Sequence, residues 1–98
     1  MEIKTTQDGA KMTVSVTGRV DTTTAPQLEH GLSKLDGVQE LVVDISGVPY
    51  MSSAGLRCLL SAQKMMMAAG GEMSVAGTQP AVREVFDITG FSDILTLV

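Results

Sequence analysis

The order of apolar and polar positions along the 98-residue chain predicts strands and helices in alternation. Residues 11–17 alternate polar and apolar side chains with a period of two, which is typical of a strand with one buried face. Residues 2–5 have the composition of a shorter strand, and Asp8-Gly9 between the two segments favours a hairpin turn. Residues 41–44 have an apolar centre, which indicates a strand that is covered on part of both faces.

Three helices are predicted along the chain. A capping box formed by Thr24 and Gln27 begins the first, whose apolar stripe continues to about residue 35. The second is expected over residues 53–69, where a pair of glycines ends it, and the third over residues 78–90. Each helix has an apolar stripe that can pack on a sheet.

Short strands are also expected at residues 72–76 and 94–98, so the predicted order is β-β-α-β-α-β-α-β. Because helices recur after strands, the sheet must contain parallel pairs joined by crossover connections. The fold class is therefore α/β, with a mixed sheet of about four to five strands and three or more helices. At this length we expect one domain, residues 1–98.

Composition restricts the partners and the environment. Apolar residues make up 44% of the chain and aromatic residues 3%, so the core is expected to be aliphatic. A net charge of −4, with seven basic residues spread thinly along the chain, argues against nucleic acid as a partner. The single Cys58, the absence of an apolar signal segment and the absence of a long apolar run predict a cytoplasmic protein with no disulfide and no direct membrane binding.

The segment Ser52-Ser53-Ala54-Gly55-Leu56-Arg57 lies where a strand gives way to the second predicted helix. The first amides of a helix have no intrahelical partner and carry the positive end of the helix dipole, so a phosphate added there is stabilised. The segment is therefore a candidate switch. The alternative is that Ser52 or Ser53 is an ordinary N-cap.

No catalytic residue, metal site or cofactor is expected. The serine segment lacks the glycine two residues earlier that a hydrolase nucleophile elbow needs, and His30 is the only histidine. No other soft ligand accompanies the run Met65-Met66-Met67, so this run is expected to be part core and part flank.

Four blocks in the sequence resemble the bacterial anti-sigma-factor antagonists, which are small members of the STAS group (sulfate transporter and anti-sigma antagonist). The blocks are Gly18-Arg19-Val20-Asp21 with Thr24-Ala25, Val43-Asp44-Ile45-Ser46, Tyr50-Met51-Ser52-Ser53-Ala54-Gly55-Leu56, and Gly70-Gly71-Glu72-Met73 with Pro80-Ala81-Val82 and Phe86-Asp87. They occur in the order and spacing of that family and cover nearly the whole chain, so the resemblance implies a STAS fold.

The resemblance also implies a bacterial partner-switching regulator of transcription that is not an enzyme. In such proteins a serine at the start of the second helix is phosphorylated by an anti-sigma factor that is also a kinase, and a serine/threonine phosphatase reverses this. The unphosphorylated form binds the anti-sigma factor and frees the sigma factor. By position that serine is Ser53, with Ser52 as second choice, because Ser52 stands where many relatives have an acidic residue.

Helical geometry indicates which side of the second helix faces a partner. At 100° per residue the core side has Leu56, Leu59, Leu60, Ala62, Met66 and Met67, the opposite side has Arg57, Ser61, Lys64 and Ala68, and a soft apolar strip between them has Ala54, Cys58, Met65 and Ala69. Gln63 falls within the apolar sector, which is a misfit. The strip suits either a partner or a neighbouring helix.

We expect the partner-binding surface to include nine residues: Asp21, Thr22, Ser52, Ser53, Ala54, Arg57, Cys58, Ser61 and Met65. Asp21 belongs to this set because loops at the carboxyl ends of neighbouring strands converge, although a turn-forming role also explains it. Arg57 is either a solvated surface residue, a counter-ion for a phosphate on Ser53, or a contact for an acidic partner.

The alternative function is a constitutive STAS scaffold, such as a subunit of a transporter or of a larger signalling complex, in which Ser53 is only a helix cap. Ser52 in place of an acidic residue favours this alternative. The sequence does not identify the sigma factor, the kinase, the phosphatase or the oligomeric state.

Overall fold

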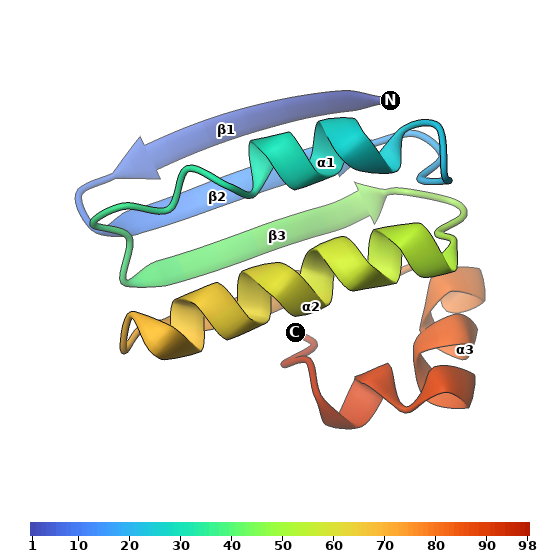
Figure 1. Ribbon diagram of the computed structural model, residues 1–98. Coiled ribbons are helices and arrows are strands. Elements are labelled where there is room, and N and C mark those ends of the chain that lie inside the picture. The colour runs from blue at the N-terminus through green and yellow to red at the C-terminus, as the bar shows by residue number, and fades with distance from the viewer.

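The computed structural model describes residues 1–98 and contains one four-stranded mixed sheet with three helices. Strands β1 (Glu2–Asp8) and β2 (Lys11–Thr17) form an antiparallel hairpin. Strand β3 (Glu40–Gly47) pairs in parallel with β2, and β4 (Glu72–Ala76) pairs in parallel with β3. The strands lie in the sheet in chain order, and the mixed α/β fold agrees with the prediction (Figure 1).

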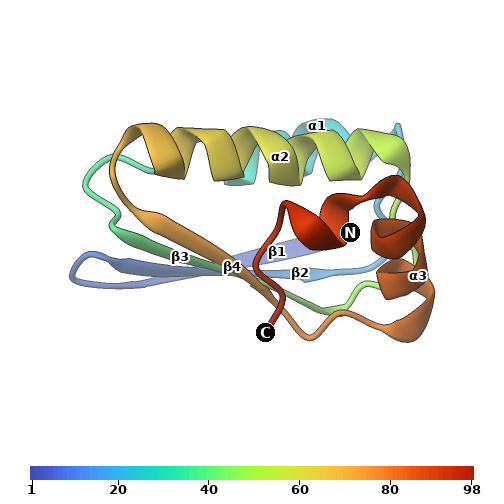
Figure 2. The same cartoon turned by 90° about the horizontal axis from the view of Figure 1, so that it is seen from below.

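Helices α1 (Ala25–Gly31) and α2 (Ser53–Ala68) cover one face of the sheet side by side (Figures 1 and 2). Each connects two parallel strands, α1 between β2 and β3 and α2 between β3 and β4. Helix α3 (Pro80–Thr89) lies beyond the end of the sheet at which β3 ends, and the short 3₁₀ helix η1 (Phe91–Asp93) follows it. The start of α2 is therefore at the same end of the molecule as α3.

The core lies between the sheet and helices α1 and α2. Alternate residues of β2 and β3 face the helices and are buried, and the side chains between them face the other side of the sheet and include Thr13, Ser15 and Asp44. Twenty-four apolar residues form one buried cluster, and no polar or charged residue is buried. Phe86 of α3 is the only aromatic residue among them, so the core is aliphatic, as its composition predicted.

Helix α2 has nearly the register expected from its sequence. Leu56, Leu59, Ala62 and Met66 are buried, as predicted. The prediction for Met67 is wrong, because its side chain is 66% exposed and lines a surface hollow beside β4. The misfit at Gln63 is real, since its amide oxygen is buried without a hydrogen-bond partner.

Helix α1 ends earlier than its apolar stripe suggested. Leu32 and Leu35 lie beyond Gly31, in the turns that lead to β3, and both are nevertheless buried. An apolar stripe reports burial and not hydrogen bonding, so it continues past the end of the helix.

The expected last strand over residues 94–98 is reduced to a single parallel bridge between Val75 and Leu97. The Val75 N–H donates to Thr96 O at 2.8 Å, and the Val98 N–H donates to Val75 O at 2.9 Å. Helix η1 and the turn after it take up residues 91–95, which leaves three residues to follow the edge of β4. The bridge still satisfies part of that edge.

Candidate functional site

The site is built where the segments that follow β2 and β3 meet at one end of the sheet. A parallel bridge joins Val20 to Met51. The Val20 N–H donates to Tyr50 O at 3.0 Å, and the Ser52 N–H donates to Val20 O at 2.8 Å. The bridge therefore places Asp21 beside Ser52 and the start of α2, which is the convergence expected from the sequence.

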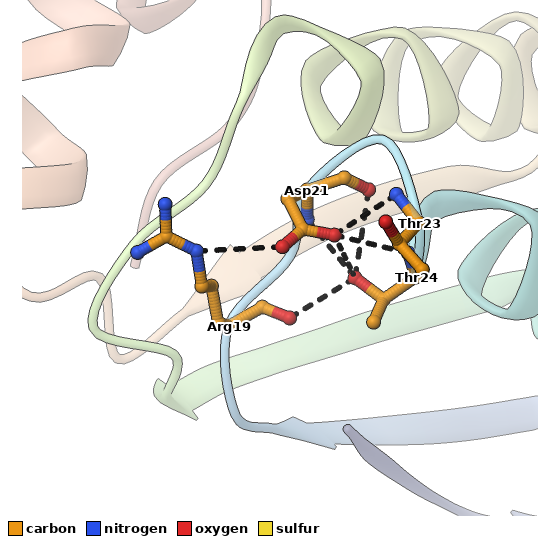
Figure 3. A network of polar contacts seen from close by, with 4 residues as sticks. All are labelled: Arg19, Asp21, Thr23 and Thr24. Atoms are coloured by element: carbon orange, nitrogen blue, oxygen red, sulfur yellow. Dashed lines mark hydrogen bonds and ion pairs between the residues drawn. The ribbon is translucent and has the colours of Figure 1, made fainter.

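Asp21 organises the turn that leads into α1 (Figure 3). Its Oδ1 atom accepts hydrogen bonds from the Thr23 N–H at 2.9 Å and from the Thr24 N–H at 3.1 Å. The Thr24 hydroxyl accepts from the Asp21 N–H at 2.9 Å and donates to Arg19 O at 3.0 Å. The expected capping box is therefore absent: the Thr24 side chain makes no cap bond, and the Thr24 hydroxyl and the Asp21 carboxylate instead form hydrogen bonds within the turn that precedes α1.

These contacts stabilise Asp21 as a carboxylate. The hydrogen bond from the Thr24 backbone is the main cause that lowers the pKa of Asp21, with further contributions from the Thr23 backbone, the Thr24 hydroxyl and the Arg19 charge. Partial desolvation of the carboxyl group opposes them. A negative charge is thus fixed beside the start of α2.

Arg19 and Tyr50 form a second contact across the Val20–Met51 bridge. The Arg19 guanidinium lies 4.1 Å from the centre of the Tyr50 ring. The Nε atom of Arg19 is 3.4 Å from Asp21 Oδ2 (Figure 3). Tyr50 is 41% exposed. Both residues are in the blocks that carry the family resemblance, but their contact depends on the bridge and is not evident from the sequence.

Ser52 and Ser53 have different environments at the start of α2. Ser52 is the N-cap residue with extended backbone dihedrals, and its buried hydroxyl has no hydrogen-bond partner. Ser53 is the first residue of the helix and is exposed. The Leu56 N–H donates to Ser52 O at 3.1 Å, so the amides of residues 53–55 precede the helical ladder.

Neither serine hydroxyl makes a cap hydrogen bond, so the ordinary N-cap role is not observed. The first turn of α2 also has no acidic side chain. The positive end of the helix dipole therefore has no compensating acidic side chain within α2 itself.

Gly55 allows the start of α2 to pack closely against the bridge. A Cβ atom at this position would lie 2.6 Å from Met51 Cγ and 2.7 Å from Val20 Cγ1, closer than these atoms can approach. Val20, Met51 and Gly55 are all buried. The absence of a side chain at residue 55 thus sets the position of Ser53, two residues earlier.

A groove runs between α1 and α2 from the start of α2, and we call it the α1–α2 groove. It consists of two adjoining hollows of about 360 Å³ and about 110 Å³, which share Glu29, Cys58 and Ser61. The first is lined by Thr22, Ala25, Pro26, Glu29, Ala54, Arg57, Cys58 and Ser61, and the second by Glu29, Leu32, Ser33, Cys58, Ser61, Ala62 and Met65.

Six of the nine residues expected to bind a partner line this groove, namely Thr22, Ala54, Arg57, Cys58, Ser61 and Met65. Asp21, Ser52 and Ser53 lie outside it, at the end of the sheet where the groove begins. The α1 wall, with Pro26 and Glu29, was missed, because only the packing of α1 against α2 places these residues opposite Ala54 and Arg57.

Cys58 forms part of the floor of the groove. Its side chain is buried, and its Sγ donates to Ala25 O at 3.5 Å. Burial is the main cause that raises the pKa of the Cys58 thiol, and the negative charge of Glu29 adds to it. The thiol is therefore a packing group that is kept protonated.

The structure contains no group of three histidine, cysteine, aspartate or glutamate residues arranged to hold a metal ion. None of its helices has the length and the apolar character that crossing a membrane requires.

Comparison with known proteins identifies the family. The sequence profile of the STAS domain matches residues 2–98. The anti-sigma-B factor antagonist of Staphylococcus aureus is 30% identical over 97 residues, which are 97% of this chain and 90% of that protein. BtrV of Bordetella bronchiseptica, a proposed anti-sigma factor antagonist, is 40% identical over 79 residues, which are 79% of this chain and 68% of that protein.

The fold leads to the same family. The crystal structure of an anti-sigma factor antagonist from Mycobacterium paratuberculosis superimposes with a TM-score of 0.87 and 28% identity, and the match covers 98% of this chain and 83% of that one. The chain therefore belongs to the STAS domain family, as the four sequence blocks indicated. These relatives are named as antagonists and not as enzymes, in agreement with the expected class of protein.

Proposed function

We propose that this chain is an anti-sigma factor antagonist that binds an anti-sigma factor in its unmodified form and is released when Ser53 is phosphorylated. The observation that carries the proposal is the position of Ser53, exposed at the first residue of α2 and next to the α1–α2 groove. The names of the relatives supply the class of partner.

The contrast between the two serines supports Ser53 as the acceptor. A kinase must bring the γ-phosphate of its nucleotide in line with the hydroxyl oxygen. The Ser53 side chain is exposed, whereas the Ser52 hydroxyl is buried. Ser52 stays the second choice, since it becomes accessible only if the start of α2 opens.

The fold is expected to tolerate the modification. A phosphoserine has a charge of about −1.5 to −2 at neutral pH and three strong acceptor oxygens. At Ser53 these oxygens lie near the free amides of residues 53–55 and the positive end of the helix dipole. Phosphorylation therefore changes the surface of the protein and leaves its core intact.

Release of the partner follows from desolvation. If the partner covers Ser53, a phosphate there must lose its water on binding, at a cost of several kcal/mol unless a cation of the partner meets it. Each 1.4 kcal/mol is tenfold in affinity, so the complex weakens by orders of magnitude. The phosphate donor in this scheme is the anti-sigma factor acting as a serine kinase, and a serine/threonine phosphatase restores the binding form.

A phosphorylation assay tests the site. The purified chain, incubated with ATP and the kinase-type anti-sigma factor of its own bacterium, is expected to gain one phosphate, detected by intact mass spectrometry. Ser53→Ala should abolish the gain. Ser52→Ala and Ser46→Ala are the matched controls and should retain it, because Ser46 is an exposed serine that lies outside the α1–α2 groove. Uptake that persists in Ser53→Ala and disappears in Ser52→Ala would move the site.

A constitutive scaffold is the second candidate function. The feature that favours it is Ser52, because the family resemblance leads us to expect an acidic residue directly before a phosphorylated serine. In this case no kinase would modify the chain, and it would co-purify with a transporter or a larger signalling complex whether residue 53 is Ser or Asp. Loss of the complex in Ser53→Asp favours the switch.

A further inference from the structure

We propose that Arg57 is the intramolecular counter-ion of a phosphate on Ser53 and is withdrawn from the α1–α2 groove when that phosphate is present. The inference rests on the proposed function, because it concerns the modified state of Ser53. It adds a residue of this chain that takes part in the switch and a second effect of the modification on the partner-binding surface.

Helix geometry places Arg57 within reach of Ser53. The two residues are four apart in α2, so their Cβ atoms lie about 5–6 Å from each other on the same face. Long side chains of a helix lean toward its N-terminus and cover the preceding turn. An arginine at residue 57 therefore extends over the turn that begins with Ser53.

Arg57 is also the only one of the three arginines that has no acidic partner. Arg19 pairs with Asp21 at 3.4 Å and lies over Tyr50, and Arg83 pairs with Asp87 at 3.2 Å. No carboxylate lies within 4.0 Å of the exposed Arg57 guanidinium, although Glu29 lines the same hollow. Its charge is therefore available.

The planar guanidinium suits a phosphate better than an isolated carboxylate. It donates two parallel hydrogen bonds to phosphate oxygens in a fixed geometry. In the unmodified protein Arg57 forms part of the wall of the groove, where it presents a positive charge to an incoming partner. A phosphate on Ser53 thus adds negative charge to the partner-binding surface and also pairs with Arg57, so that its positive charge is no longer presented to the partner.

The second ionisation of the phosphate, with a pKa near 6 in free phosphoserine, reports the contact directly. Phosphoserine is incorporated at residue 53 during synthesis, and ³¹P NMR follows its titration in the otherwise native chain and in Arg57→Gln. The charges that face this position are Arg57, Asp21 and its partner Arg19, and Glu29 across the groove. Only Arg57 is changed.

Arg57→Gln is expected to raise this pKa by roughly 0.2–0.4 units, because the dianion loses a nearby cation. Arg57→Lys should restore most of the difference, since the charge returns without the bidentate geometry. Lys64→Gln is the matched control and should leave the titration unchanged, because Lys64 is an exposed cation of α2 farther from Ser53.

Identical titrations of the arginine and glutamine forms would overturn the inference, and so would an equal shift in Lys64→Gln. Neither result bears on the proposed function, because the phosphate is installed without a kinase and no partner is present. Failure of the proposed function has a different signature, namely a phosphoserine-53 protein that binds its anti-sigma factor as well as the unmodified chain does.

Discussion

Asp21 is the residue through which the loop after β2 acquires a defined shape. Its carboxylate accepts hydrogen bonds from two backbone amides and pairs with Arg19, which in turn lies over Tyr50. The sequence left two roles open for this residue, turn formation and partner binding. The structure shows the first, and the position of Asp21 beside the start of α2 keeps the second as part of the proposal.

Asp21→Asn is expected to reduce stability at neutral pH and to have a smaller effect in acid. Asparagine keeps an acceptor oxygen but loses the charge. Because the pKa of Asp21 is lowered in the folded state, its contribution is fully present above the ordinary value of 3.8 and is lost as the pH falls through the folded value. Urea unfolding of the native protein and of Asp21→Asn, from neutral pH down to acid pH, measures the difference in their free energies of unfolding.

The native protein must be compared with Asp21→Asn at each pH, because the pKa of Asp87 is also lowered in the folded state. The Ser92 hydroxyl and then Arg83 lower the pKa of Asp87, so acid weakens the native protein there as well. Asp36→Asn, at an exposed aspartate without a hydrogen bond or ion pair, is the control and should change little at any pH. A stability difference for Asp21→Asn that does not shrink in acid would contradict the role of its charge.

At the scale of the elements, the start of α2 is buried on one side, where it packs against the Val20–Met51 bridge, and exposed to solvent on the other. Gly55 lets the helix approach the Val20–Met51 bridge, and the exposed Ser53 and Arg57 lie on the outer surface. The helix thus has a closely packed buried side beneath the exposed residue at which we propose the modification. A switch that acts without refolding requires a helix start whose packing stays in place when its exposed side is modified.

Gly55→Ala tests the close packing between the start of α2 and the Val20–Met51 bridge. The added methyl group overlaps Met51 and Val20, so we expect a loss of about 1–3 kcal/mol in the free energy of unfolding, despite the better helix propensity of alanine. Chemical denaturation measures the loss. Ser61→Ala, on the exposed side of the same helix, should be neutral or slightly stabilising, and unchanged stability in Gly55→Ala would show that the bridge can move away.

Ser53→Asp tests the electrostatics of the same helix end. The first turn of α2 has no acidic residue, so a carboxylate at residue 53 is expected to raise stability by about 0.3–1 kcal/mol at low salt and by less at high salt. Thermal unfolding at two salt concentrations measures both effects. Ser61→Asp, in the middle of the helix, should show no such gain, and a destabilised Ser53→Asp would argue against tolerance of a phosphate there.

The sequence predicted helices and strands correctly where the period of apolar residues determines the secondary structure. The strand at residues 11–17 and the buried stripe of α2 agree with the structure because alternation and helical period are local properties. Three predictions differ from the structure for non-local reasons. Met67 is exposed because it lies beside the edge strand β4, and the last strand is shortened because η1 and the turn after it take up part of it. Thr24 does not form the expected cap because its side chain and Asp21 bond to each other in the preceding turn. The Arg19–Tyr50 contact and the α1 wall of the groove arise only when distant segments come together.

At the scale of the whole molecule, the parts of the proposed switch lie on one surface. The loop with Asp21, the start of α2 and the α1–α2 groove all lie at or beside one end of the sheet. Helices α1 and α2, which form the groove, cover the same face of the sheet (Figures 1 and 2). The buried cluster contains no charged group, and burial raises the pKa of its one titratable side chain, the Cys58 thiol. Control by phosphate is therefore expected to act through surface charge and not through a change of fold.

The measurement that tests this account most directly is the affinity of the kinase-type anti-sigma factor for the chain with serine or with phosphoserine at residue 53. Phosphoserine in place of the exposed Thr6 of β1, outside the α1–α2 groove, is the control for added charge elsewhere. We predict that phosphoserine at residue 53 weakens binding by about 100-fold or more, which corresponds to about 2.8 kcal/mol, while the control binds as the unmodified chain does. Equal affinity of all three forms would contradict the central claim that Ser53 lies within the surface that the partner must cover.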